Sequence, residues 1–240
     1  GRIEAWTDLA ARAAALEARV GAACSGDGER PREARLRAME LRLGVEMFRT
    51  HGGRDAAMAA MLLEQVGRGA AAPRAVVWGH NAHVSRGRLG YLGSDEPAMG
   101  GCLARDLGAA YSAVGVVFGE GEFVALDQDG DGVWRFRTYT LRGVPSGSVE
   151  HEVGRAVGGQ AAVVDLRGVV DGTPLAAWAR ASRGYRWFGG YRVPTDVERE
   201  TPGAGALGTM TPGEEFDLLA YFPRTMGTKP VDPSRASGGR

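Results

Sequence analysis

Apolar side chains recur at three- and four-residue steps through the first quarter of the chain, which predicts amphipathic helices. One such stripe covers residues 2 to 20, and a second follows Pro31, a residue that suits the first turn of a helix. A third helix is expected from Gly53, with Asp55 in its first turn, where a carboxylate is favoured by the helix dipole. The first two helices predict a helical hairpin over residues 1–50.

An unbroken apolar run from Ala75 to Trp78 indicates a short strand that is buried on both faces, as in a parallel sheet covered by helices. Further apolar runs predict buried strands at residues 111–118, 161–166 and 216–221. Helical stretches separate these runs, and such an alternation favours right-handed crossovers. We therefore expect an α/β fold, a three-layer α/β/α domain with a mainly parallel sheet and the N-terminal helical hairpin as an appendage.

Two histidines follow the first expected strand directly. His80 and His83 come after Gly79, where the strand should end. In open α/β sheets ligands bind outside the carboxyl ends of the strands, so these side chains are candidates for a site. Glu120 and Glu122 follow the strand at 111–118 and can share the same edge. The alternatives are that His80 only caps the strand, that His83 is an ordinary loop residue, and that both glutamates face solvent.

Other motifs have structural explanations. The run Asp127 to Gly132 imitates the start of a calcium-binding loop, but Thr138 stands where that loop needs a bidentate Glu. Expected strands flank it, so an Asp-Gly hairpin turn is the better interpretation. The sequence contains no Gly-x-Ser-x-Gly, which excludes the serine nucleophile of ordinary α/β hydrolases.

Composition excludes several classes of partner. The formal net charge is zero, with 29 basic and 29 acidic residues, so neither nucleic acid nor a membrane is expected as a partner. No apolar run approaches the roughly 18 residues of a membrane helix. Two histidines supply fewer protein ligands than the usual three of catalytic zinc, so we expect no metal and no cofactor. We expect a cytoplasmic location; since the sequence lacks an initiator Met, a signal peptide upstream stays open.

Several segments together resemble one known family. The run Val76-Val77-Trp78-Gly79-His80-Asn81-Ala82-His83-Val84 resembles the V-W-x-H-N-x-H motif of the erythromycin esterase family. Upstream, Arg54-Asp55-x-x-Met58 resembles the helix that precedes this motif in the family. Segments near Tyr111, Phe118 and Phe216 keep the order of the family, so the resemblance extends from about Arg54 to Thr225.

The resemblance implies a hydrolase that cleaves a carboxylic ester, with a small-molecule ester such as a macrolide lactone as substrate. By motif, His80 would help to bind and activate water or steady the oxyanion, and His83 would support it. Arg54 would orient a carboxylate or the carbonyl of the substrate. Asn81 and Glu120 are the expected substrate-binding residues.

One departure from the family pattern matters. Members of the family carry an early Gly-Glu-x-x-His-Gly motif whose His is taken as the general base, and this sequence has none. The nearest string is His51-Gly52, but Glu46 stands five residues before the His instead of three. The resemblance therefore implies that residues 51–225 correspond to the C-terminal half of such a protein. The missing N-terminal half is then an expected partner, and residues 226–240 are an expected disordered tail.

Two other function classes stay open. One is a non-catalytic binding protein in which His80 and His83 ligate a metal or haem, since the family's fold resembles that of a haem- or iron-binding group. The other is a non-catalytic relative associated with polysaccharide synthesis. A Gly-Glu-x-x-His-Gly motif upstream would favour the esterase.

Overall fold

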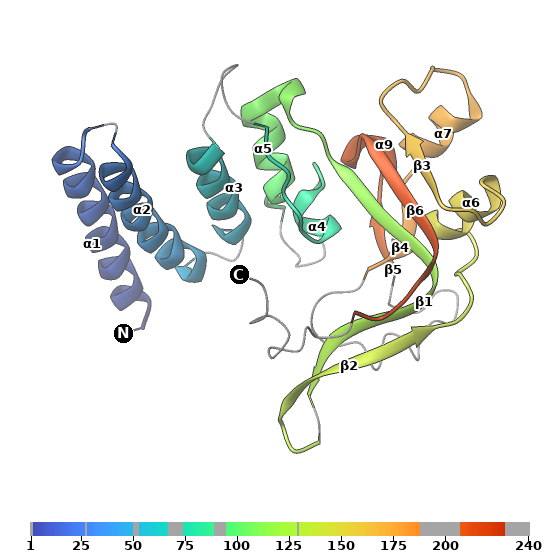
Figure 1. Cartoon of the computed structure of the whole chain (residues 1–240), viewed down its shortest axis with the longest axis horizontal. Coiled ribbons are helices and arrows are strands. Elements are labelled where there is room, and N and C mark those ends of the chain that lie inside the picture. Colours follow the sequence, from blue (N-terminus) through green and yellow to red (C-terminus); the bar gives the residue numbers. More distant parts are fainter. Residues whose placement is uncertain are drawn as a thin grey trace, which may run out of the picture. The chain divides into compact units, whose positions relative to one another are not determined.

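The computed structural model describes residues 2–26, 28–49, 53–66, 74–88, 95–128, 130–187 and 207–228. The chain divides into two compact units, whose helices and strands are labelled in Figure 1. The first unit comprises Gly1–Val114 with Glu214–Phe216, and the second comprises Gly115–Gly213 with Asp217–Arg240.

The first unit is built from helices. Helix α1 (Arg2–Ala23) and helix α2 (Glu29–Arg49) form the hairpin that the apolar stripes predict, and they lie side by side (Figure 1). The side chains of Arg42 and Glu17 form an ion pair between them. Helix α3 (Gly53–Val66) follows and packs against α2. Residues 2–23 and 29–49 are therefore helical.

A small apolar core joins α3 to the helix that carries Met99. The unit contains the short helix α4 (Asn81–Val84), helix α5 (Met99–Leu107) and the 3-10 turn η2 (Gly108–Ala110). The buried core side chains come from α3 and α5, namely Ala59, Leu63, Met99, Cys102 and Leu103. A Cβ at Gly100 would lie 2.2 Å from the carbonyl oxygen of Val84. Glycine is therefore needed where α5 meets the end of α4.

The second unit contains two sheets. Strands β1 (Val114–Gln128), β2 (Trp134–Leu141), β3 (Ala162–Asp165) and β6 (Leu218–Thr225) form a sheet in the order β2-β1-β6-β3. Strands β4 (Arg183–Arg186) and β5 (Leu207–Met210) form a second, antiparallel pair. Helices α6 (Val149–Ala156) and α7 (Pro174–Arg180) belong to the same unit, and helix α9 spans Pro212–Glu215.

The expected mainly parallel sheet is wrong for the described strands. Strands β1 and β2 are antiparallel and join through a hairpin, as the Asp-Gly turn predicts, and β3 pairs antiparallel with β6. Only β1 and β6 run parallel among the described strands. Gly121, at φ 122°, makes their close approach possible, because a Cβ there would lie 2.1 Å from the Thr225 carbonyl oxygen. The fold is thus mixed α/β with a mostly antiparallel sheet, and alternation along the chain did not determine strand direction.

The segment from Arg74 to His80 also differs from expectation. It forms no strand, and its side chains are exposed, Val76 to 96% and Trp78 to 89%. The Pro-, Gly- and Thr-rich stretch over residues 194–213 suggests a loop, but its described part contains strand β5 and part of α9. The nearest match to the base motif, His51-Gly52, and most of the expected tail, residues 229–240, lie outside the described residues. In the part of the chain that the structure describes, no helix is both long and apolar enough to cross a membrane.

Candidate functional site

A buried carboxylate holds one of the motif histidines. Asp55 lies in the first turn of α3 and is only 2% exposed. Its two oxygens lie 3.0 and 2.9 Å from Nδ1 of His83, which projects from α4. The backbone N–H of Met99, at the start of α5, donates to the same carboxylate at 2.9 Å. Three helices of the first unit therefore meet at the Asp55 side chain.

The contacts of His83 show which of its two ring nitrogens carries the proton. The guanidinium of Arg54 lies 2.7 Å from Nε2 of His83. Arginine stays protonated and only donates, so Nε2 must accept, and the ring proton of neutral His83 is on Nδ1, facing the Asp55 carboxylate. The result is a directed chain of hydrogen bonds in which Asp55 orients His83 and His83 orients Arg54. We call these three residues the Asp-His-Arg chain.

The second motif histidine has a different role in local structure. His80 is exposed and precedes α4, and its Nδ1 accepts from the backbone N–H of Ala82 at 3.1 Å. His80 is thus the N-cap of α4, a role that a side-chain acceptor fills for the free N–H groups of a helix start. This cap fixes Nδ1 as an acceptor, so the proton of the neutral ring is on Nε2. Asn81 is the first residue of α4 and is half-buried.

The structure brings together only part of the expected site. Arg54 and His83 are in direct contact, and His80 lies three residues away along the same segment. Glu120 belongs to the second unit, where it accepts from the backbone N–H of Gly143 at 3.0 Å and faces Arg224 at 3.8 Å. The substrate-binding roles of Glu120 and Asn81 stay predictions.

Asp55 is the residue that the sequence reasoning missed. A carboxylate in a first helical turn already has a local explanation, so nothing in its neighbours pointed to a contact with His83, 28 positions later. The only available signal was the combination of Arg54-Asp55 with the His motif inside the resemblance.

The geometry bears on metal binding as well. Within the described residues, no three His, Cys, Asp or Glu side chains gather as they would around a metal ion. Both ring nitrogens of His83 already face protein groups, Asp55 and Arg54. A metal at His83 would have to displace one of them.

Three solved structures are similar to this chain in fold. One is a protein from Bacillus cereus, 20% identical, with a TM-score of 0.74 and coverage of 93% of this chain and 53% of that protein. A succinoglycan biosynthesis protein is 17% identical, with a TM-score of 0.69 and coverage of 93% and 51%. A mutant of the erythromycin esterase EreC in its open conformation is 17% identical, with a TM-score of 0.63 and coverage of 96% and 54%. The chain therefore spans about half the length of each.

Sequence comparison points to one family. No curated protein matches the chain. The erythromycin esterase family matches it over residues 7–225, which includes the Asp-His-Arg chain, the cap formed by His80 and the whole of β6. The match covers most of the sequence and agrees with the motif that carries the resemblance. The chain belongs to the erythromycin esterase family.

Proposed function

We propose that the protein is a carboxylic ester hydrolase of the erythromycin esterase type, in which Arg54 binds the carbonyl oxygen that becomes negatively charged during hydrolysis. The supporting observation is the Asp-His-Arg chain, which starts at a carboxylate that is 2% exposed and ends at an exposed guanidinium. The planar guanidinium group of Arg54 has five N–H donors, and His83 accepts from one of them. Arg54 therefore retains donors that can bind an anion. Donors fixed in advance around a developing oxyanion are usually the largest single contribution to catalysis of acyl transfer.

His83 itself is not arranged as the base of this reaction. Its Nδ1 faces Asp55 and its Nε2 faces Arg54, so neither nitrogen is directed at a water molecule. We assign to His80 the binding of the attacking water, because it is exposed and lies on the same short segment as His83. Asn81 follows it and is proposed to contact the substrate.

We propose that the general base and much of the substrate pocket come from a part of the protein outside residues 1–240. The similar solved structures are considerably longer than this chain, which covers 51–54% of them. The apolar segment Ala75–Trp78 leads directly into the site and exposes Val76 to 96% and Trp78 to 89%. Exposed apolar residues that form one surface commonly mark an interaction site. We propose that the rest of the fold packs on this segment and completes the site beside His80.

The family supports the proposed substrate class. EreC is described as an erythromycin esterase, and we propose a small-molecule ester, with macrolide lactones as the first candidates, for this protein too. A lactone carbonyl presents the single oxygen that the remaining donors of Arg54 suit.

The test is hydrolysis of erythromycin and of a simple aryl ester by the longest protein that the gene encodes. Arg54→Gln should lower kcat/KM about 10²–10³-fold, the effect usually found when one oxyanion donor is removed. Arg12→Gln is the matched control, because the side chain of Arg12 in α1 is 76% exposed. The activity of this variant should stay within about twofold of wild type.

Two results would overturn the proposal. If the wild-type protein hydrolyses neither ester, the proposed esterase function is wrong. Hydrolysis that Arg54→Gln leaves unchanged would keep the function and remove the role of the Asp-His-Arg chain.

A further inference from the structure

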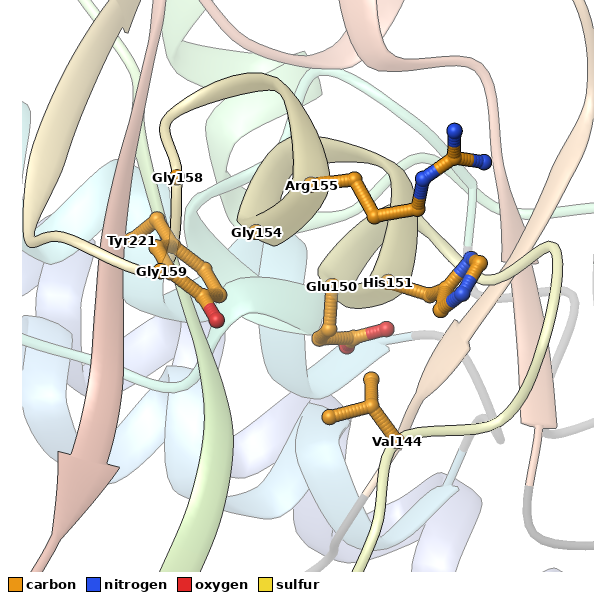
Figure 2. Close-up of a pocket in the computed structure, with 8 residues that line it drawn as sticks. All are labelled: Val144, Glu150, His151, Gly154, Arg155, Gly158, Gly159 and Tyr221. Atoms are coloured by element: carbon orange, nitrogen blue, oxygen red, sulfur yellow. The ribbon is translucent and has the colours of Figure 1, made fainter.

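A second candidate binding site lies in the second unit, separate from the Asp-His-Arg chain. A cavity of about 280 Å³ lies beside α6, with Tyr221 of β6 and Val144 in its wall (Figure 2). This volume is near the lower end of the range found for small-molecule sites, roughly 300–1,000 Å³. The cavity therefore suits a ligand of a few heavy atoms.

One buried carboxyl group in the cavity wall has an unused oxygen. Glu150 is 1% exposed, and its Oε1 accepts from the backbone N–H of Arg186 at 2.8 Å. Its Oε2 has no hydrogen-bond partner among the described residues. Buried polar atoms are nearly always paired, so an unpaired oxygen in a cavity wall indicates a place for a ligand's N–H or O–H group.

Two donors lie on the same helix as Glu150. His151 and Arg155 are four residues apart, and residues at this spacing share one face of a helix. The Nδ1 of His151 accepts from the backbone N–H of Gly147 at 3.3 Å, which leaves the proton of the neutral ring on Nε2 as a donor. In Figure 2 the His151 ring and the Arg155 guanidinium lie on the same side of the Glu150 carboxyl group, opposite Tyr221. This side of the cavity favours an anionic group.

A glycine shapes the opposite wall. A Cβ at Gly154 would lie 2.6 Å from the hydroxyl oxygen of Tyr221. Glycine therefore lets the Tyr221 hydroxyl approach the backbone of α6 at the cavity wall. The Tyr221 ring and Val144 supply the apolar part of the lining, so the cavity combines an acceptor, two donors and an apolar surface.

We propose that this cavity binds a small carboxylate that also carries an ammonium or hydroxyl group. The carboxylate pairs with Arg155 and His151, the ammonium or hydroxyl group donates to Oε2 of Glu150, and a short hydrocarbon chain lies against Tyr221 and Val144. Both polar ends of such a ligand meet complementary groups. A simple carboxylate or a simple amine would satisfy only one end.

Three compounds with the same carbon skeleton test this proposal. L-Valine carries a carboxylate and an ammonium group, 2-hydroxy-3-methylbutanoate carries a carboxylate and a hydroxyl group, and 3-methylbutanoate carries only the carboxylate. Each is titrated into the purified 240-residue chain while backbone and side-chain NMR shifts of α6 are followed. Valine or the hydroxy acid should bind saturably at α6 and about tenfold or more tightly than 3-methylbutanoate, because a hydrogen bond to a charged group is added.

Two variants and one control complete the test. Glu150→Gln presents an NH2 group toward the ligand donor and should abolish the preference over 3-methylbutanoate. Arg155→Gln should weaken both carboxylates about tenfold or more. Arg142→Gln, an exposed arginine that does not line the cavity, should change neither affinity.

The outcomes that overturn the proposal are equally defined. One is the absence of a saturable shift at α6 with both valine and the hydroxy acid. Another is binding of 3-methylbutanoate as tight as that of these two compounds. The third is a Glu150→Gln variant that has the circular dichroism spectrum of wild type and still prefers valine or the hydroxy acid over 3-methylbutanoate. Since the readout is binding to the second unit, its failure is independent of ester hydrolysis at Arg54.

Discussion

Replacing Asp55 by Asn tests the Asp-His-Arg chain at its buried end. The substitution keeps the size of the side chain but exchanges one accepting oxygen for an NH2 group, which only donates. The carboxylate accepts from the N–H of Met99 at 2.9 Å and from Nδ1 of His83 at 2.9 Å. An asparagine accepts with one atom only. Both of these contacts are made by Oδ2, and Oδ1 lies 3.0 Å from the same Nδ1. Whichever way the amide is turned, its NH2 group therefore faces the Nδ1–H of His83, and in the Oδ2 position it faces the N–H of Met99 as well.

The magnitude follows from burial and charge. A hydrogen bond to a charged group contributes roughly 1.5–3 kcal/mol, and a buried donor without an acceptor costs roughly 1–3 kcal/mol. Asp55 is 2% exposed, so water cannot replace the lost acceptor. Because the two figures partly describe the same loss, we expect the free energy of unfolding of the first unit to fall by about 2–4 kcal/mol. If the NH2 group turns to His83, the ring proton moves to Nε2 and the contact with Arg54 is lost as well.

Two measurements on the purified chain check this expectation. Hydrogen exchange of the α3 amides reports the free energy of unfolding, and ¹⁵N NMR of the His83 ring reports which nitrogen carries the proton. Asp8→Asn is the control, since that side chain is 63% exposed, and it should change the unfolding free energy by less than about 0.5 kcal/mol. An Asp55→Asn chain as stable as this control, with the proton still on Nδ1, would refute the reasoning.

Three further changes test other parts of the chain. Burial raises the pKa of Glu150, so the stability contributed by this carboxyl group is full below the ordinary value of 4.5 and is lost as pH rises through the pKa of the folded state. The unfolding free energy of Glu150→Gln should therefore rise relative to that of wild type as pH increases. A difference between the two proteins that does not change with pH in urea titrations would contradict this. Trp78→Ser, at a side chain 89% exposed, should change stability by less than about 0.5 kcal/mol, and the amides of Ala75–Trp78 should exchange as in an unfolded peptide; protected amides would disprove the exposed segment. Gly154→Ala should cost about 1–3 kcal/mol in urea unfolding because its Cβ meets the Tyr221 hydroxyl at 2.6 Å, and a neutral result would show that the ring moves freely.

The local signals in the sequence predicted local structure well. The apolar stripes predicted α1 and α2. Serine is a common helix cap, and the hydroxyl of Ser148 accepts from the N–H of His151 at 3.2 Å at the start of α6. Thr173 and Pro174 begin α7 in the same way, with a hydrogen bond of 3.2 Å from the N–H of Ala176. Such signals act over three or four residues, so a single sequence contains them in full.

Strand direction and the partner of His83 depend on contacts between distant residues. A turn at Gly130–Gly132 makes β1 and β2 antiparallel, but no pattern within β3 specifies that it pairs antiparallel with β6, more than fifty residues later. In the same way, Asp55 contacts His83 across 28 positions through the packing of α3 against α4 and α5. The motif identified Arg54 and His83, whereas only the fold identifies the carboxylate between the helices.

The run Ala75–Trp78 shows what an apolar pattern does and does not determine. Burying a large apolar side chain is worth roughly 1.5–3 kcal/mol, so such a run predicts that the residues are covered, but it does not specify by which segment. Within residues 1–240 the side chains of Val76 and Trp78 gain almost none of this, since they are 96% and 89% exposed. A strand also needs neighbours for its backbone N–H and C=O groups, which this segment lacks among the described residues. The predicted strand and the exposed segment agree if the neighbouring strands belong to a part of the fold outside residues 1–240. Trp78→Ser should then leave the free energy of unfolding of this chain unchanged, and should lower it by about 3–5 kcal/mol in a protein that contains that part.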